Sequence, residues 1–279
     1  MPPNYRYIKV FPIAGALGAE IKSVDIAQPL EREVVSEIRQ AFLDHLVIFF
    51  RNQELTPQEQ LAFAQLFGEP MAYRQMKGLP ECPLITAVIK LEHEQVNFGG
   101  VWHSDTSYLQ HPPMASMLYA IEIPPFGGDT LFANQYMAYE NLSEGLKKTL
   151  DGLVGVNTST KPEVARTRED LLREAGTELK VLEAVHPVVR THPETGRKGL
   201  YINNAHTTHF KGWSEQESRS LLDYLFEHQV RSEFTCRFRW EKGALAFWDN
   251  RCVQHNPVND YQGFKRIMHR VTLAGDKPC

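Results

Sequence analysis

The chain has 279 residues, of which 42% are hydrophobic and 23% are charged, and its formal net charge is −4. A chain of this length and composition can bury a sizeable core, and we expect one domain over residues 1–279. The lysines and arginines are scattered, and the lack of a basic run argues against binding to nucleic acid or to a membrane surface. We therefore expect a small molecule as the partner.

The cysteines and the N-terminus bear on the compartment. The four cysteines, Cys82, Cys236, Cys252 and Cys279, have no paired spacing, which is typical of reduced thiols. The N-terminus has no apolar signal core, and no uninterrupted apolar run approaches transmembrane length. We expect a cytoplasmic protein, and we also expect it to form a homo-oligomer.

The first quarter of the chain predicts strands and two helices. Residues 7–29 have the pattern of short strands broken by glycine and proline, and residues 31–45 have the apolar spacing of an amphipathic helix. The apolar run 46–50 indicates a buried strand. Thr56-Pro57-Gln58-Glu59 is a capping box with proline at the first helical position, and it predicts a helix that continues to Gly68.

The middle of the chain predicts mostly strands. Residues 85–101 have the pattern of short strand-like pieces, residues 114–122 form an apolar stretch, and residues 139–152 look helical. Residues 157–180 are polar and charged with no apolar period. We interpret this segment as a loop that acts as a lid.

The last third predicts a helix followed by several strands. His192-Pro193-Glu194-Thr195-Gly196 reads as a surface turn, and Ser214-Glu215-Gln216-Glu217 is a second capping box. Residues 234–240, 244–248 and 267–273 have the patterns of strands. The whole pattern favours a mainly β fold with flanking helices on one side, built on a double-stranded β-helix, or jelly roll.

Three residues have the chemistry of a metal site. His103 and Asp105 are two apart, and in an extended strand their side chains would point to the same face. His255 follows a strand and a polar turn, where a third ligand can project inward. Two imidazoles and one carboxylate on one face of a metal leave the opposite face open, as in non-haem Fe(II) oxygenases. The similar pair His192 and Glu194 lies in the predicted surface turn, and we interpret it as accidental.

Two arginines lie near the end of the chain on a predicted strand. Arg266 and Arg270 are four apart, so both side chains share one face. Two guanidinium groups on an inner face need anions, which are either acidic side chains of the protein or ligands. Thr130, after a glycine pair that suggests a tight turn, can offer a hydroxyl to one of these anions.

With these residues assembled, the chain resembles the taurine/2,4-dichlorophenoxyacetate dioxygenase (TauD/TfdA) family of Fe(II)- and 2-oxoglutarate-dependent oxygenases, and its taurine dioxygenase branch in particular. The similarity runs nearly end to end. It is carried by Phe50-Arg51-Asn52-Gln53, Trp102-His103-Ser104-Asp105, Gly127-Gly128-Asp129-Thr130-Leu131, His186-Pro187-Val188-Val189-Arg190, Trp248-Asp249-Asn250-Arg251, and Arg266-Ile267-Met268-His269-Arg270.

The resemblance implies a role for each of these residues. His103, Asp105 and His255 match the family's metal ligands, Thr130 and Arg266 match the residues that bind 2-oxoglutarate, and Arg270 matches the contact to the anion of the primary substrate. It implies hydroxylation of a substrate C–H bond with O2, yielding succinate and CO2, with C–S or C–O cleavage where the product is unstable.

Two departures from the family pattern concern the substrate. An asparagine of the family is Gly99 here, next to Phe98, and a histidine of the family aligns near Tyr73. These changes predict an anion that is bulkier or more apolar than taurine, such as another sulfonate, a sulfate ester or an aryloxyalkanoate. Two alternatives stay open, namely a metal-dependent hydrolase with the same ligands and a non-catalytic anion-binding jelly-roll metalloprotein.

Overall fold

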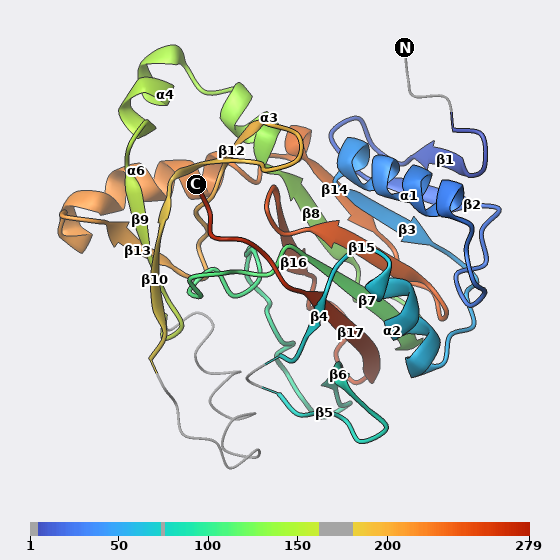
Figure 1. Cartoon of the computed structure of the whole chain (residues 1–279). Helices are drawn as coiled ribbons and strands as arrows, with labels where there is room; N and C mark the ends of the chain where they lie inside the picture. Colours follow the sequence, from blue (N-terminus) through green and yellow to red (C-terminus); the bar gives the residue numbers. More distant parts are fainter. Residues whose placement is uncertain (1–4, 74–75, 162–180) are drawn as a thin grey trace.

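A large sheet forms the framework of the computed structural model, which describes residues 5–73, 76–161 and 181–279 (Figure 1). Neighbouring strands in this sheet are antiparallel, except that β2 and β3 are parallel. In these ranges the sheet contains β1 (Lys9–Pro12), β2 (Ala19–Lys22), β3 (Val47–Phe50), β15 (Leu245–Asp249), β7 (Ala115–Glu122), β17 (Arg266–Leu273), β6 (Cys82–Lys90) and β5 (Gly78–Leu79) in that order, with β4 (Pro70–Met71) on β17.

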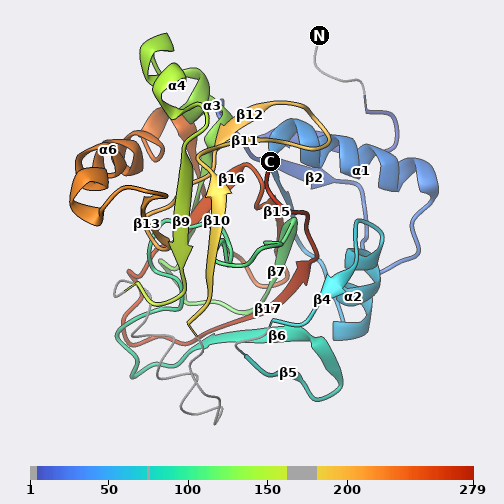
Figure 2. The same ribbon diagram turned by 60° about the vertical axis from the view of Figure 1, so that its left-hand side comes forward.

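Smaller sheets complete the β structure. One contains β14 (Thr235–Phe238), β8 (Thr130–Asn134) and β16 (Val253–Pro257), another contains β10 (Glu183–Pro187), β9 (Val154–Thr158) and β13 (Thr207–Phe210), and β11 (Val189–Thr191) pairs with β12 (Lys198–Leu200). Figure 2 shows β9 and β10 side by side. Apolar side chains of the β14–β8–β16 sheet pack against those of the large sheet. The two facing sheets form the predicted jelly-roll core.

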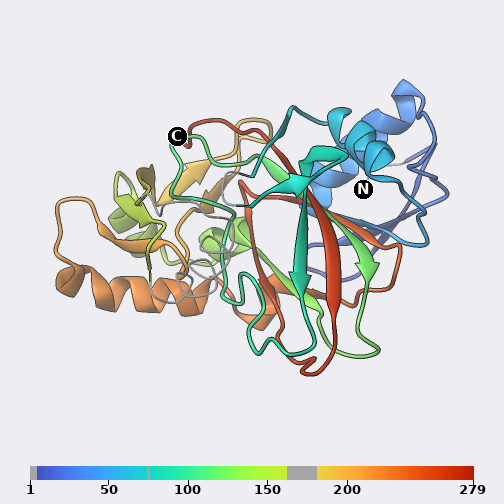
Figure 3. The same cartoon turned by 90° about the horizontal axis from the view of Figure 1, so that it is seen from below.

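The helices lie at two ends of the molecule (Figures 1 and 3). They are α1 (Arg32–His45), α2 (Pro57–Gln65), α3 (Gln135–Glu140), α4 (Glu144–Leu150) and α6 (Glu215–His228), with a 3₁₀ turn η1 (Ser232–Phe234). Both predicted capping boxes are present, at Thr56 and at Ser214. The placement of all helices on one side is wrong, because α3, α4 and α6 share a separate core with residues of β12 and β13.

The side chains of the central strand β17 alternate between an apolar core and the space between the two sheets. Val271 and Leu273 of β17 pack in the core beneath α1 and α2, whereas Met268 packs between the two sheets. Because side chains alternate along a strand, Arg266 and Arg270 lie on the same inner face as Met268. The strand β3 is buried on both faces, which explains why residues 46–50 are all apolar.

Three segments differ from the local structure that the sequence predicts or lie partly outside the described residues. Residues 82–90 form one strand, and the segment 91–101 has no strand, because turns replace sheet pairing there. The helix expected over 139–152 is two short helices separated at Asn141–Ser143, where Ser143 caps the second one. Of the expected lid over 157–180, residues 157 and 158 belong to β9 and residues 162–180 lie outside the described ranges.

The turn predicted over residues 192–196 is present, and Pro193, Glu194 and Gly196 are exposed, but His192 at its start is buried. Its side chain is 1% exposed, and its Nε2 donates to Asp249 Oδ2 at 3.0 Å. Arg251 donates to both oxygens of Asp249, at 2.8 and 2.7 Å, and to Glu194 at 2.7 Å. Glu194 is also paired with Arg39 of α1 at 2.6 Å. This ion cluster ties the β11–β12 turn to the end of β15 and to α1.

The same cluster contains three groups that could hold a metal, His192, Asp249 and Cys252, with donor atoms within 4.8 Å of one another. Both oxygens of Asp249 already accept hydrogen bonds from Arg251 and its main chain. Burial raises the pKa of the Cys252 thiol well above its usual value, so the thiol stays neutral. The cluster is therefore a closed internal ion network that needs no metal.

We expect Arg251→Met to lower the free energy of unfolding by about 3–5 kcal/mol, because it leaves the buried Asp249 carboxylate without its main cation. Urea denaturation followed by circular dichroism measures this loss. Arg237→Met is the matched control, since Arg237 pairs with Asp129 at 2.6 Å but its side chain is 54% exposed. The control should lose at most about 1 kcal/mol, and an equal loss in the two variants would contradict the prediction.

Candidate functional site

Two segments far apart in sequence form the candidate site. The main chains of His103 and His255 bond to each other in both directions, at 3.1 and 2.8 Å, as an isolated antiparallel bridge. His255 lies inside β16, whereas His103 and Asp105 lie in a loop and turn rather than in the extended strand that was predicted. The bridge thus brings the three side chains together through pairing with β16, not through strand alternation.

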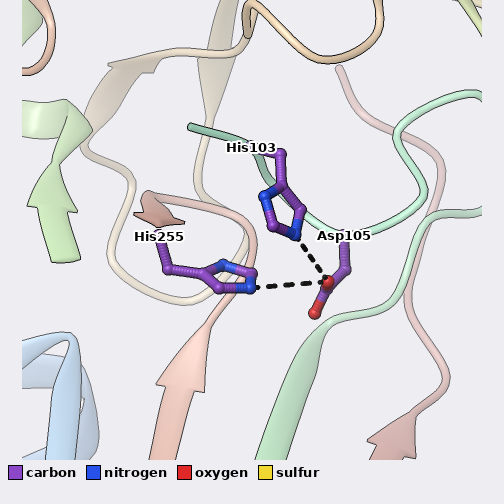
Figure 4. Close-up of side chains that lie close together, drawn as sticks. All are labelled: His103, Asp105 and His255. Atoms are coloured by element: carbon purple, nitrogen blue, oxygen red, sulfur yellow. Dashed lines mark ion pairs between the residues drawn. The ribbon is translucent and has the colours of Figure 1, made fainter. Parts of the chain in front are cut away.

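The three side chains point toward one another (Figure 4). Asp105 Oδ1 lies 3.7 Å from His103 Nε2 and 3.8 Å from His255 Nε2. The Nδ1 of His103 donates to the main-chain oxygen of Val101 at 2.6 Å. Because a carbonyl oxygen can only accept, the proton sits on Nδ1 and the lone pair of Nε2 faces the other two residues.

The protonation states in the site suit a metal cation. Burial lowers the pKa of both His103 and His255, so the imidazoles are neutral. Burial alone would raise the pKa of Asp105, but Arg270, the two histidines and Ser116 together hold it below its usual range. Metal ligands must be deprotonated to bind, and these three are.

Arg270 and Arg266 differ in whether an acidic side chain of the protein pairs with them. Arg270 Nη2 pairs with Asp105 Oδ2 at 2.6 Å, and that carboxylate raises the arginine's pKa against the opposing effect of burial. Arg266 is 6% exposed, and its Nε and Nη2 have no hydrogen-bond partner in the described part of the chain. Burial lowers its pKa. A buried cation in this state lacks an anion.

The space around Arg266 is a small cavity between the two sheets. Thr130 lies at the start of β8, is 3% exposed, and its hydroxyl accepts a bond from Trp240 Nε1 at 2.9 Å. The cavity is lined by Val88, Phe98, His103, Leu118, Thr130, Phe132, Trp240, Trp248, His255, Pro257, Arg266 and Arg270. The two histidines and both arginines therefore border one space.

The residues expected at the substrate wall lie together. The Arg270 guanidinium lies 4.9 Å from the ring centre of Tyr73, which meets Phe98 edge-on at 6.5 Å between ring centres. Gly99 has a φ of +74°, and a Cβ there would lie 3.0 Å from Cε1 of His103. Glycine at this position therefore also allows the chain to approach the His103 ring closely.

Three residues of the site have contacts that the sequence did not indicate. Trp240 anchors Thr130, Ser116 donates to Asp105 Oδ2 at 2.7 Å, and Asn250 donates to Ser116 at 3.1 Å. Ser116 is one of several small residues in an apolar stretch, and only its partner across space makes it notable. Asn250 lay in a matching motif, but nothing local pointed to its partner.

Comparisons with known proteins agree with this geometry. Residues 9–272 match the family model described as "Taurine catabolism dioxygenase TauD, TfdA family". The chain is 37% identical to an alpha-ketoglutarate-dependent sulfate ester dioxygenase of Pseudomonas putida, with 99% of this chain and 92% of the relative covered. It is 32% identical to the alpha-ketoglutarate-dependent 2,4-dichlorophenoxyacetate dioxygenase of Cupriavidus pinatubonensis, with 95% and 97% covered.

A solved structure has the same fold. It is a putative alpha-ketoglutarate-dependent taurine dioxygenase from Burkholderia xenovorans, and it superposes with a TM-score of 0.85 at 38% identity over 97% of this chain and 94% of the other. The family model covers nearly the whole chain, and these relatives align over almost their full lengths. The chain belongs to the TauD/TfdA family of dioxygenases.

Proposed function

We propose that this protein is an Fe(II)- and 2-oxoglutarate-dependent dioxygenase that hydroxylates a C–H bond of a small organic anion. The observation that carries the proposal is that two neutral imidazoles, His103 and His255, face the ionised Asp105 beside a cavity that also contains the buried Arg266, whose Nε and Nη2 have no hydrogen-bond partner among the described residues. The relatives' names, which specify alpha-ketoglutarate (2-oxoglutarate), support it.

The residues fit both cofactors. Two imidazoles and one carboxylate suit Fe(II) and leave ligand positions open for other molecules. A dicarboxylate supplies the anion that the unpartnered Nε and Nη2 of Arg266 require, and the Thr130 hydroxyl lies in the same lining. When bound, the two cofactors and O2 supply oxidative decarboxylation to succinate and CO2 coupled to insertion of one oxygen atom into the substrate.

The protein's own groups bind and orient the reactants. His103, Asp105 and His255 would hold the metal, Arg266 and Thr130 would hold the distal carboxylate of 2-oxoglutarate, and Arg270 would bind the anion of the primary substrate. Tyr73 and Phe98 form an aromatic wall beside Arg270 that keeps water from the target carbon. Hydroxylation of a carbon bonded to sulfur or oxygen would release sulfite, sulfate or a phenol.

The surroundings of Arg270 favour a substrate with an apolar tail. A second cavity adjoins the aromatic wall, because Tyr73 belongs to its lining and Thr272 lies two residues beyond Arg270 on the same face of β17. Its lining is largely apolar and includes Met71, Ala72, Tyr73, Thr106, Tyr108, Leu109, Pro113, Leu182 and Thr272. An apolar tail that extends from an anion on Arg270 toward this lining would suit it better than the charged amine of taurine.

Two alternatives explain less. A metal-dependent hydrolase with the same ligands gives no role to the Nε and Nη2 of the buried Arg266, which have no hydrogen-bond partner in the described part of the chain. A non-catalytic anion-binding protein gives no reason for open metal positions next to that arginine. Turnover separates the three, since only the dioxygenase consumes O2 and 2-oxoglutarate and forms succinate.

The proposal also includes the cellular location of the protein. None of the helices in the described ranges is long and apolar enough to cross a membrane. All four cysteines are free thiols, which supports the proposed cytoplasmic location. That residues 1–279 act as one domain and that the protein forms a homo-oligomer stay predictions, the second of which sedimentation velocity tests.

One prediction of the proposed function concerns substrate choice. The protein is reconstituted with Fe(II) without oxygen, and O2 uptake and succinate formation with 2-oxoglutarate are then measured across alkyl sulfate esters, alkylsulfonates and aryloxyacetates. We expect an anion with an apolar chain to stimulate turnover at least about 10-fold more than taurine, since burying two or more methylenes is worth about 1.6 kcal/mol. If taurine is the best substrate, the argument from the pocket fails.

Another prediction concerns Asp105, a proposed metal ligand. We expect Asp105→Ala to abolish Fe(II)-dependent succinate formation, because it removes one of three donors and leaves Arg270 as an unpaired buried cation beside the metal. Asp151→Ala, at an exposed aspartate, is the control and should match the wild type. Retained 2-oxoglutarate turnover in a folded Asp105→Ala protein would remove Asp105 from the ligand set.

A further prediction concerns Arg266. Arg266→Gln should raise the 2-oxoglutarate concentration for half-maximal turnover roughly 10- to 100-fold, because a hydrogen-bonded charge contributes about 1.5–3 kcal/mol. Its affinity for Fe(II) alone should not change, since Arg266 forms no ion pair with the three metal-site residues. An unchanged 2-oxoglutarate dependence would exclude Arg266 from the site of this cosubstrate.

A further inference from the structure

The two oxygens of Asp105 have different surroundings. Oδ1 faces the Nε2 atoms of His103 and His255, at 3.7 and 3.8 Å. Oδ2 accepts from the Ser116 hydroxyl at 2.7 Å and pairs with Arg270 Nη2 at 2.6 Å. A carboxylate turns readily about its last bond, so something has to select which oxygen faces the imidazoles.

Ser116 is placed for this task by the large sheet. It lies on the inner face of β7, is 0% exposed, and pairs in register with Trp248 of β15 and Thr272 of β17. Neighbours on both sides therefore fix its main chain, and its side chain points between the two sheets toward Asp105. Rigid central strands hold a supporting residue more precisely than a loop does.

The neighbouring donors fix the direction of the Ser116 hydroxyl proton. Its oxygen is approached by Asn250 Nδ2 at 3.1 Å and by Arg270 Nη2 at 3.3 Å. Amide and guanidinium nitrogens can only donate, so the oxygen accepts from both of them. The single hydroxyl proton of Ser116 must then point to Asp105 Oδ2.

Asn250 is itself held in one orientation. Its Oδ1 accepts from Trp248 Nε1 at 2.9 Å, so its Nδ2 is the atom that faces Ser116. Its main-chain N–H donates to Met114 O at 2.9 Å, and the residue is fully buried. A one-way chain of donors thus runs from Trp248 through Asn250 and Ser116 to Asp105.

We propose that Ser116 is a positioning residue that holds Asp105 with Oδ1 alone facing the metal position, and that Asn250 sets the direction of the Ser116 hydroxyl. The inference rests on the proposed function, because it assumes a metal at these residues. Arg270 also contacts Oδ2, but it is the proposed partner of the substrate anion. The Ser116 proton has Oδ2 as its acceptor, whereas Arg270 Nη2 is shared between Oδ2 and the Ser116 oxygen.

Ser116→Ala tests this role through metal binding alone. Fe(II) affinity is measured without O2 and without 2-oxoglutarate, by competition with a chromogenic chelator. We expect binding at least about 10-fold weaker than in the wild type, the usual effect of losing a partner of a metal ligand. The absorption band formed on adding 2-oxoglutarate should be weaker at equal Fe(II) and should recover at higher Fe(II).

Two variants separate positioning from general stability. Ser218→Ala is matched, because Ser218 is also 0% exposed, donates to Ser214 O at 2.9 Å and accepts from Phe210 N at 3.0 Å, but it lies on α6 in the separate helical core. It should bind Fe(II) like the wild type. Ser116→Thr keeps the hydroxyl and should bind within about 3-fold of the wild type, well inside the change expected when such a partner is lost.

The possible results have distinct meanings. Wild-type affinity in Ser116→Ala, equal losses in Ser116→Ala and Ser218→Ala, or an equal loss in Ser116→Thr would each overturn the positioning role. Failure of the wild type itself to bind Fe(II) would instead overturn the proposed function. Weak binding in Ser116→Ala alone supports the proposal.

Discussion

The antiparallel bridge between the main chains of His103 and His255 is the constraint on which the site depends. His103 and Asp105 lie in irregular chain, which would not by itself hold two side chains at a fixed distance. The two hydrogen bonds fasten this loop to β16, a strand of the jelly roll. A second tie strengthens the join, because Ser104 donates its hydroxyl to Val253 O at 2.9 Å. The rigid sheet thereby fixes the positions of His103 and Asp105, which are not part of it.

Near this bridge, one arginine is paired with a carboxylate of the protein and the other is not. Asp105 and Arg270 are both buried and paired with each other, and leaving either one alone would be costly. Arg266 is equally buried but lacks an acidic partner among the described residues. In a stable protein such a cation is tolerated where a ligand supplies the anion. One end of the cavity therefore has the donor groups that a metal requires, and the other end has an arginine with nitrogens free to bind a carboxylate.

The structure around the site is braced by a second buried network. Asp249, Asn250 and Arg251 are consecutive at the end of β15, yet their side chains serve different purposes. Asp249 and Arg251 join His192 and Glu194 in the ion cluster, whereas Asn250 turns the other way and bonds to Ser116. The ion cluster fixes the turn from which Asn250 projects. Stability of the fold and the orientation of Asp105 are thus connected through three adjacent residues.

The sequence by itself determined the features that depend on neighbours in the chain. The capping boxes at Thr56 and Ser214, the fully apolar β3 and the shared face of Arg266 and Arg270 follow from local periodicity and local hydrogen bonding, and the structure has all of them. The resemblance to a family also identified the residues that the fold brings together at the site. Such patterns are readable because a strand or a helix imposes its repeat on the residues within it.

Only the tertiary structure decided the contacts between residues that are distant in the chain. No local pattern indicates the burial of His192 or the hydroxyl of Ser116 on Asp105. Nor does one indicate that Arg270 pairs with Asp105 while Arg266 has no ion pair with an acidic side chain among the described residues. The segment 91–101 lost its predicted strands for the same reason, since a strand needs a partner across space. Pairing, burial and charge balance depend on which chain segments meet, and periodicity along one segment carries no information about its partner.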